Sequence, residues 1–152
     1  MGCSLFNSRR PDVVRRLRVL AHHWRPLAGA AGLQVIVGIG LRLLPLPALR
    51  KASRRLRPAV DVLLPGAEDH VIWAIEATGR RLPGLSTCLV RALVGEMRLS
   101  SPERRLSLVI GVKRTSSGSL LSHAWLRDRE RVLIGGPIDD SLSTIVQWES
   151  AA

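Results

Sequence analysis

The spacing of the apolar residues changes from helical to strand-like near Pro102, and this change limits the fold more than any other feature. Before it, one apolar stripe at helical spacing runs along residues 86–99. Its members are Leu89, Val90, Leu93, Val94 and Met97. After it, residues 106–114 are rich in β-branched residues and are interrupted by a glycine, which is typical of a buried strand. The sequence therefore predicts an α+β fold.

Two more short apolar segments, residues 122–127 and 132–136, lie on either side of the polar turn at residues 128–131. Such a pair of segments predicts a β-hairpin. A further helix is expected to end around Gly79, before a turn made by Pro83 and Gly84. The expected order is helix, helix, strand, and then a hairpin whose second strand closes the sheet.

The net charge is confined to the first part of the chain. Residues 1–60 carry twelve Arg or Lys and one acid, Asp12, which gives 12 − 1 = +11. Residues 61–152 carry eleven basic and eleven acidic residues and sum to zero. We therefore expect a basic helical N-terminal region at residues 1–60 and a core at residues 61–152. The neutral core argues against nucleic acid as a partner, whereas the basic region is free to meet a membrane surface, a peptide or an acidic protein.

Within the basic region, the sixteen residues 26–41 carry no charge. A membrane-spanning helix normally needs about eighteen apolar residues or more, and Gln34 and four glycines weaken the case further. We expect a helix that is buried or lies on a membrane surface, followed over residues 41–58 by a proline-broken connection and a short basic helix. The N-terminus shows no secretory signal, so we expect a cytoplasmic protein with reduced thiols and a candidate membrane contact through its basic region.

Cys88 lies in the first turn of the predicted helix, behind Ser86 and Thr87, either of which can cap it. Unpaired amides and the helix dipole favour a thiolate at this position. A nucleophilic cysteine needs a base, and His123 is the natural candidate if the sheet packs on the Cys88 helix. From spacing alone, a structural role for both residues remains open. Two cysteines with a distant histidine make no metal site, and no cofactor is expected.

The segments "TCLVRAL", "LVIGVKR" and "SHAWL", in this order and at this separation, resemble the leader peptidases of lasso-peptide biosynthesis. These are transglutaminase-like, papain-related cysteine proteases, and by motif the resemblance covers residues 85–136. It implies a Cys-bearing helix packed on an antiparallel sheet, with Cys88 as the nucleophile and His123 as the base. It also implies a short, stand-alone peptidase whose partners are a precursor peptide, a separate leader-binding recognition protein and a lasso cyclase.

The chain departs from the family pattern at the third catalytic residue. The pattern places an acid about twelve residues after the histidine, and this chain has Gly135 there. Asp139 is the first alternative and Asp140 the second, because a flexible Gly-Gly-Pro segment precedes them. Asp128 is a poorer candidate, since it lies in the turn about 16 Å along the strand from His123. A backbone carbonyl is a further way to orient the ring.

The expected function is removal of the leader from a ribosomally made lasso precursor, with Cys88 attacking the scissile carbonyl and His123 carrying the proton. Two alternatives remain open. The same pair of residues serves acyl transfer to an amine, as in transglutaminases, and a chain without its acid suits a non-catalytic, membrane-associated scaffold. We expect Trp125 to pack in the core and Arg91 to be solvated.

Overall fold

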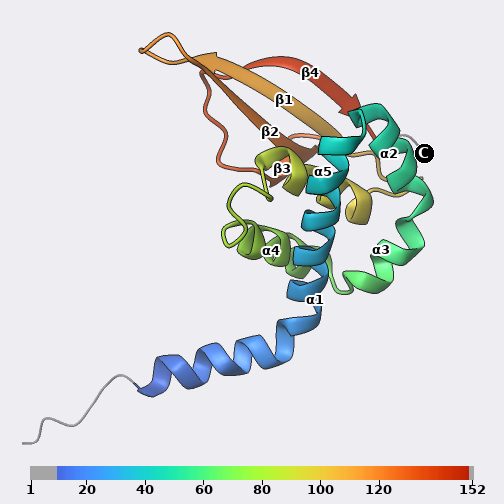
Figure 1. Ribbon diagram of the computed structural model, residues 1–152, viewed down its shortest axis with the longest axis vertical. Helices are drawn as coiled ribbons and strands as arrows, with labels where there is room; N and C mark the ends of the chain where they lie inside the picture. Colours follow the sequence, from blue (N-terminus) through green and yellow to red (C-terminus); the bar gives the residue numbers. More distant parts are fainter. Residues whose placement is uncertain (1–9, 151–152) are drawn as a thin grey trace, which may run out of the picture.

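A computed structural model describes the backbone of residues 10–150 and the side chains of residues 24–150. It confirms an α+β fold in which the helices come first and pack together beside one antiparallel sheet (Figure 1). The helices are α1 (Arg10–Leu43), α2 (Leu46–Arg55), α3 (Arg57–Leu63), α4 (Glu68–Gly79) and α5 (Cys88–Leu99). The strands are β1 (Ser107–Arg114), β2 (Leu120–Asp128), β3 (Arg131–Ile134) and β4 (Ser143–Glu149).

Helix α1 joins two segments of different composition, the arginine-rich residues 10–25 and the uncharged residues 26–41. It continues through Pro26, which lacks an amide hydrogen and weakens one turn. Figure 1 shows the helix changing direction within its N-terminal half. A proline inside a helix is a common cause of such a bend. The turns after Pro26 hold because they pack against the rest of the protein.

One face of α1 is buried. Ala30, Leu33, Gln34 and Val37 follow the i, i+3, i+4, i+7 pattern and are at most 5% exposed. The opposite face is exposed, so the uncharged segment is buried on one side only. Trp24–Leu43 is also long and apolar enough to cross a membrane by length and composition, a property that core helices share.

The hydrophobic core joins both parts of the chain. Val60 and Leu64 belong to the same cluster of buried side chains as residues of α1, α4 and α5. The predicted boundary between residues 60 and 61 falls inside α3. That division remains a prediction based on charge.

The sheet has the strand order β3-β2-β1-β4 and is antiparallel throughout. The predicted hairpin is confirmed, with Asp128 paired to Arg131 and Arg129 in the left-handed region at φ 52°. Strand β4 was not predicted, although Thr144, Ile145 and Val146 favour strands, because its apolar residues do not alternate clearly and none of its residues is buried. It pairs with β1 and forms one edge of the sheet.

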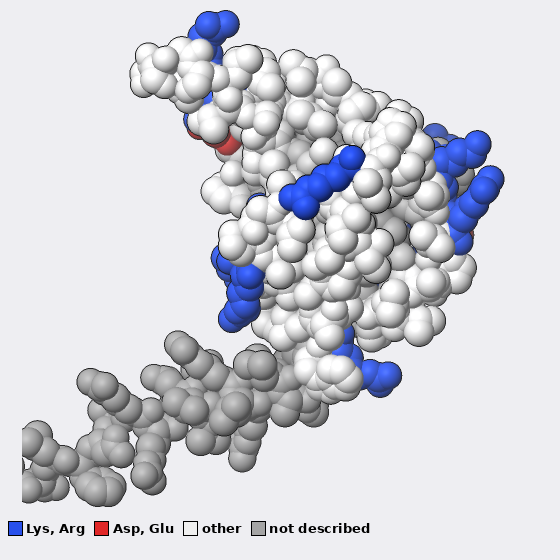
Figure 2. All heavy atoms as spheres, in the orientation of Figure 1, with Lys and Arg blue, Asp and Glu red and all other residues white. Residues whose placement is uncertain are grey.

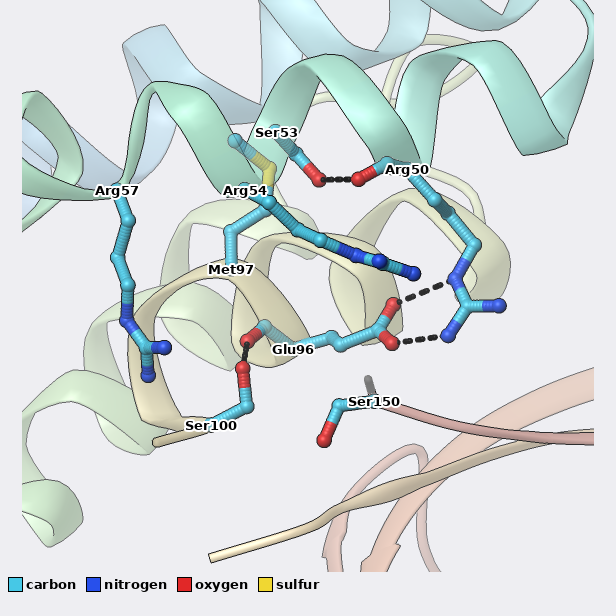
Figure 3. Close-up of a pocket in the computed structure, with 8 residues that line it drawn as sticks. All are labelled: Arg50, Ser53, Arg54, Arg57, Glu96, Met97, Ser100 and Ser150. Carbon is cyan, nitrogen blue, oxygen red and sulfur yellow. Dashed lines mark hydrogen bonds and ion pairs between the residues drawn. The ribbon is translucent and has the colours of Figure 1, made fainter. Parts of the chain in front are cut away.

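An ion pair holds the C-terminal half of α5 against α2. Arg50 donates twice to the carboxylate of Glu96, and its Nε lies 3.1 Å from Glu96 Oε2 (Figure 3). The Arg50 guanidinium also lies over the ring of Trp148, 5.7 Å from its centroid. Both paired side chains are nearly buried, at 12% and 10% exposure. This contact therefore ties α2, α5 and β4 together.

Candidate active site

Cys88 is the first residue of α5, as predicted, and it is half-buried with a free thiol. Thr87 caps the helix, because its Oγ1 accepts a hydrogen bond from Val90 N at 3.3 Å. The first intrahelical hydrogen bond runs from Arg91 N to Thr87 O at 3.1 Å. The amides of Cys88 and Leu89 come before that bond and lie at the free end of the helix, beside the thiol.

A buried glutamine anchors the segment that leads into Cys88. Gln34 is fully buried, and its Nε2 donates to Ile75 O at 3.1 Å and to Thr78 Oγ1 at 2.6 Å. Its Oε1 accepts from the Ser86 hydroxyl. Because buried amide groups need partners, this arrangement fixes Ser86 relative to α1 and α4. Gln34, which argues against a membrane-spanning helix, thus helps to position Cys88.

His123 lies on β2, opposite Gly111 of β1, and stacks with Trp125 at a centroid distance of 6.0 Å. The Trp125 ring covers Gly111, where a Cβ would lie 2.9 Å from the ring. Trp125 is 5% exposed, which confirms the prediction that it packs in the core. The imidazole is therefore held on one side by an aromatic ring that cannot move without disturbing the sheet.

A backbone carbonyl orients the imidazole. His123 Nε2 lies 2.6 Å from Gly135 O. A carbonyl oxygen only accepts hydrogen bonds, so Nε2 carries the proton and donates it to that oxygen. In the neutral ring this leaves the lone pair on Nδ1, which becomes the basic nitrogen. The carbonyl thus does what the third member of a catalytic triad does, which is to fix the tautomer and the ring orientation.

The conformation of Gly135 explains why no acid occupies this position. Its φ is +90°, a region that side chains strongly disfavour. A Cβ here would lie 2.8 Å from Ala124 O and 3.0 Å from the Cβ of Trp125. An aspartate at residue 135 therefore has neither the backbone conformation nor the space that it needs.

Of the three carboxylates considered for the third role, Asp139 and Asp128 bind other side chains. Asp139 pairs with Lys113 Nζ and accepts from Ser141 N at 2.9 Å, and these contacts, Lys113 foremost, hold the pKa of Asp139 well below its usual value. Asp128 accepts from Arg104 Nε at 2.7 Å, and Asp140 is exposed. The assignment of Asp139 as the third member stays a prediction.

Two residues that the sequence did not indicate connect the cysteine helix to Gly135. Glu76 of α4 accepts from Gly135 N at 3.1 Å through Oε1, and its Oε2 lies 2.6 Å from Arg91 Nη1. Arg91 is one helical turn after Cys88, and its side chain is 22% exposed, so the expectation that it is solvated is wrong. A chain of contacts therefore runs from the helix of Cys88 through Glu76 and Gly135 to His123.

Within residues 24–150, no group of three or more His, Cys, Asp or Glu side chains is arranged to hold a metal ion.

A family model described as the transglutaminase-like superfamily matches residues 29–146, which is most of the chain. Neither the curated proteins nor the solved structures gave a significant match. The matched region includes Cys88, His123 and Gly135. The superfamily is typically one of cysteine-dependent enzymes and includes both peptidases and acyltransferases. The chain belongs to the transglutaminase-like superfamily.

Proposed function

We propose that this protein is a cysteine peptidase that removes the leader from a lasso precursor peptide, with Cys88 as nucleophile and His123 as base. The observation that carries the proposal is the hydrogen bond from His123 Nε2 to Gly135 O, because it supplies an oriented, basic Nδ1 without an acid. The motifs around Cys88 and His123 support the choice of a leader peptidase over other members of the superfamily.

The reaction follows from these roles. Among the described side chains no hydrogen bond joins Cys88 to His123. In the proposed reaction the two side chains approach, the thiol gives its proton to His123 Nδ1, and the thiolate attacks the scissile carbonyl carbon. The amides of Cys88 and Leu89 stabilise the resulting oxyanion. The C–N bond then breaks, the leaving amine takes the proton from the imidazolium, and a thioester remains on Cys88. Water, deprotonated by the same imidazole, attacks the thioester and releases the leader with a free carboxylate.

The proposed partners are a separate leader-binding recognition protein and a lasso cyclase, with a membrane surface as a further contact in a cytoplasmic setting. Figure 2 shows several groups of basic side chains around a largely uncharged face. A groove of about 420 Å³ runs beside α1, where Trp24, Ile36 and Val62 are 59%, 61% and 80% exposed. Exposed apolar side chains among basic ones suit a protein or membrane contact.

The test incubates the full-length protein with a candidate lasso precursor peptide and its leader-binding protein, and follows the peptide by mass spectrometry. We expect leader release by the wild type, and a fall on the order of 10⁵-fold or more in Cys88→Ala and His123→Ala. Cys3→Ser is the matched cysteine control, lies outside the described residues, and should leave the rate unchanged. An amide-linked product in place of a shortened peptide would show acyl transfer. No reaction with all partners present would favour the scaffold.

A further inference from the structure

We propose that Glu76 is a positioning residue that holds Gly135 so that its carbonyl orients His123. The inference deepens the proposed function and rests on it for its effect on catalysis. Glu76 is remote in sequence from both residues, 59 positions from Gly135, and reaches the site only through the packing of α4 beside β3.

Gly135 needs a contact that holds its backbone. The pairing of β3 with β2 ends at Ile134, which is opposite Leu126, so the ladder does not fix the next residue. Gly135 is followed by another glycine, and glycine has the freest backbone of all residues. A carbonyl offered from such a segment orients a ring only if another contact limits its rotation.

Glu76 provides this contact at the amide of Gly135. Gly135 N donates to Glu76 Oε1 at 3.1 Å, while Gly135 O faces His123 Nε2 at 2.6 Å. Glu76 of α4 therefore binds the amide of Gly135, and His123 of β2 binds its carbonyl. The contact with Glu76 fixes the peptide plane that precedes Gly135, and the hydrogen bond with His123 fixes the plane that follows it, so the two contacts together define the backbone of Gly135.

Glu76 is itself held by Arg91 of α5, the helix that begins with Cys88. Its Oε2 pairs with Arg91 Nη1 at 2.6 Å, and the two side chains are only 24% and 22% exposed. One carboxylate thus uses its two oxygens for two different purposes. Oε2 binds the helix of Cys88 and Oε1 binds Gly135, which orients His123. The same carboxylate therefore contacts both the helix that bears the thiol and the residue that orients the imidazole.

The experiment observes the imidazole directly. In full-length protein labelled with ¹⁵N-histidine, two-bond ¹⁵N–¹H correlation spectra at alkaline pH report which nitrogen of His123 carries the proton. We expect the wild type to show the Nε2–H tautomer. Glu76→Ala should move both ¹⁵N shifts of His123 toward those of a mixture of tautomers, and leader cleavage should fall roughly a hundredfold in kcat, as expected for a misplaced catalytic group.

Conservative variants separate positioning from folding. Glu76→Gln keeps an oxygen acceptor for Gly135 N but loses the ion pair with Arg91, so it should move the shifts less than Glu76→Ala does. Glu76→Asp keeps the charge but withdraws the carboxylate by one methylene, so it should shift the ¹⁵N signals of His123 as Glu76→Ala does. It provides the test if Glu76→Ala does not fold. Asp69→Ala, on the same helix with an 89% exposed side chain, is the matched control and should leave the shifts and the rate unchanged.

Unchanged ¹⁵N shifts in folded Glu76→Ala or Glu76→Asp would overturn the inference. The readout needs no substrate, so it fails separately from the proposed function. If the shifts move but no precursor is cleaved by the wild type, Glu76 still positions the ring and only the peptidase proposal falls.

Discussion

Both ends of α5 carry an Arg–Glu ion pair, yet the two pairs lead to different parts of the molecule. Near its beginning, Arg91 binds Glu76, and the contacts continue to Gly135 and His123. Near its end, Glu96 binds Arg50, and the contacts continue to α2 and Trp148. The second pair is more deeply buried, at 12% and 10% side-chain exposure against 22% and 24%.

The difference in burial indicates that the two Arg–Glu ion pairs have different roles. Removing one partner of a deeply buried pair leaves an unpaired charge and is costly, whereas a more exposed pair contributes little to stability. The pair at the end of α5 therefore holds the fold together. The pair at its beginning contributes less to the free energy of unfolding, and its effect lies in the position of the imidazole.

Gly135→Ala should have the largest effect, because it breaks both stability and the site. The new Cβ meets Ala124 O and Trp125 in a backbone conformation at φ +90°. We expect a loss of about 2 kcal/mol in the free energy of unfolding and a fall of roughly a hundredfold in the rate. Urea unfolding and the cleavage assay measure the two. Gly135→Asp should be at least as damaging, and a more active Gly135→Asp would mean that the missing acid is the true defect.

Arg50→Ala should affect the fold without affecting the site. It leaves the Glu96 carboxylate nearly buried and unpaired, which should lower the free energy of unfolding by about 3 kcal/mol. Arg54→Ala, a neighbour on α2 that lines the same pocket, is the control and should change it by less than about 0.5 kcal/mol (Figure 3). Urea titrations of both variants give the comparison. A reduced alkylation rate of Cys88 in folded Arg50→Ala would show that the two ends of α5 are coupled.

Arg91→Gln should affect the site more than the stability of the fold. It removes the ion pair of Glu76 but leaves the contact of Glu76 with Gly135, so we expect a loss of about 1 kcal/mol or less. The loosened carboxylate should lower the cleavage rate by about tenfold, as for a positioning group that is weakened but not removed. Thermal or urea unfolding measures the loss of stability, and the cleavage assay measures the loss of rate. A loss of stability as large as that of Arg50→Ala would contradict the comparison.

A third ion pair predicts how stability depends on pH. The hydrogen bond from Arg104 is the main cause that lowers the pKa of Glu68. A lowered folded-state pKa means that the stabilisation is present above the unfolded value of about 4.3 and is lost as the pH falls below it. Because the two side chains are 32% and 26% exposed, Arg104→Met should remove only about 1 kcal/mol at pH 7. Urea unfolding at pH 7 and pH 3 should show this difference shrinking in acid, and a constant difference would rule out the two carboxylates that Arg104 binds, Glu68 and Asp128, as its source.

Asp139→Asn should have the smallest effect. Its carboxylate is exposed and bound to Lys113 and Ser141, while Gly135 O already holds His123. The cleavage rate should change by less than about threefold, against the roughly ten-thousandfold loss seen when an orienting acid is replaced. A large loss in Asp139→Asn would restore Asp139 as the third member.

The parts of the fold that the sequence predicted are those that local patterns determine. The capped helix beginning at Cys88 and the turn at residues 128–131 each depend on a few neighbouring residues. Strand β4 and the passage of α1 through Pro26 depend on packing against distant elements, and local patterns do not report such packing.

The candidate site divides in the same way. Cys88 and His123 were identified from their segments and from the resemblance, and a backbone carbonyl was one of several ways foreseen to orient the ring. Glu76 and Arg91 were missed, because a single glutamate within an apolar helix gives no sign of the glycine that it will bind 59 residues later.

The most direct test of the account is the rate at which iodoacetamide alkylates Cys88, measured by intact mass in a Cys3→Ser background with and without His123→Ala. If the imidazole Nδ1 accepts the proton of Cys88, as proposed, His123→Ala should slow alkylation at pH 7 by about tenfold or more and remove the pH dependence that the imidazole imposes. Equal rates and equal pH profiles in the two proteins would show that the cysteine and the histidine do not act together, and would contradict the proposed active site.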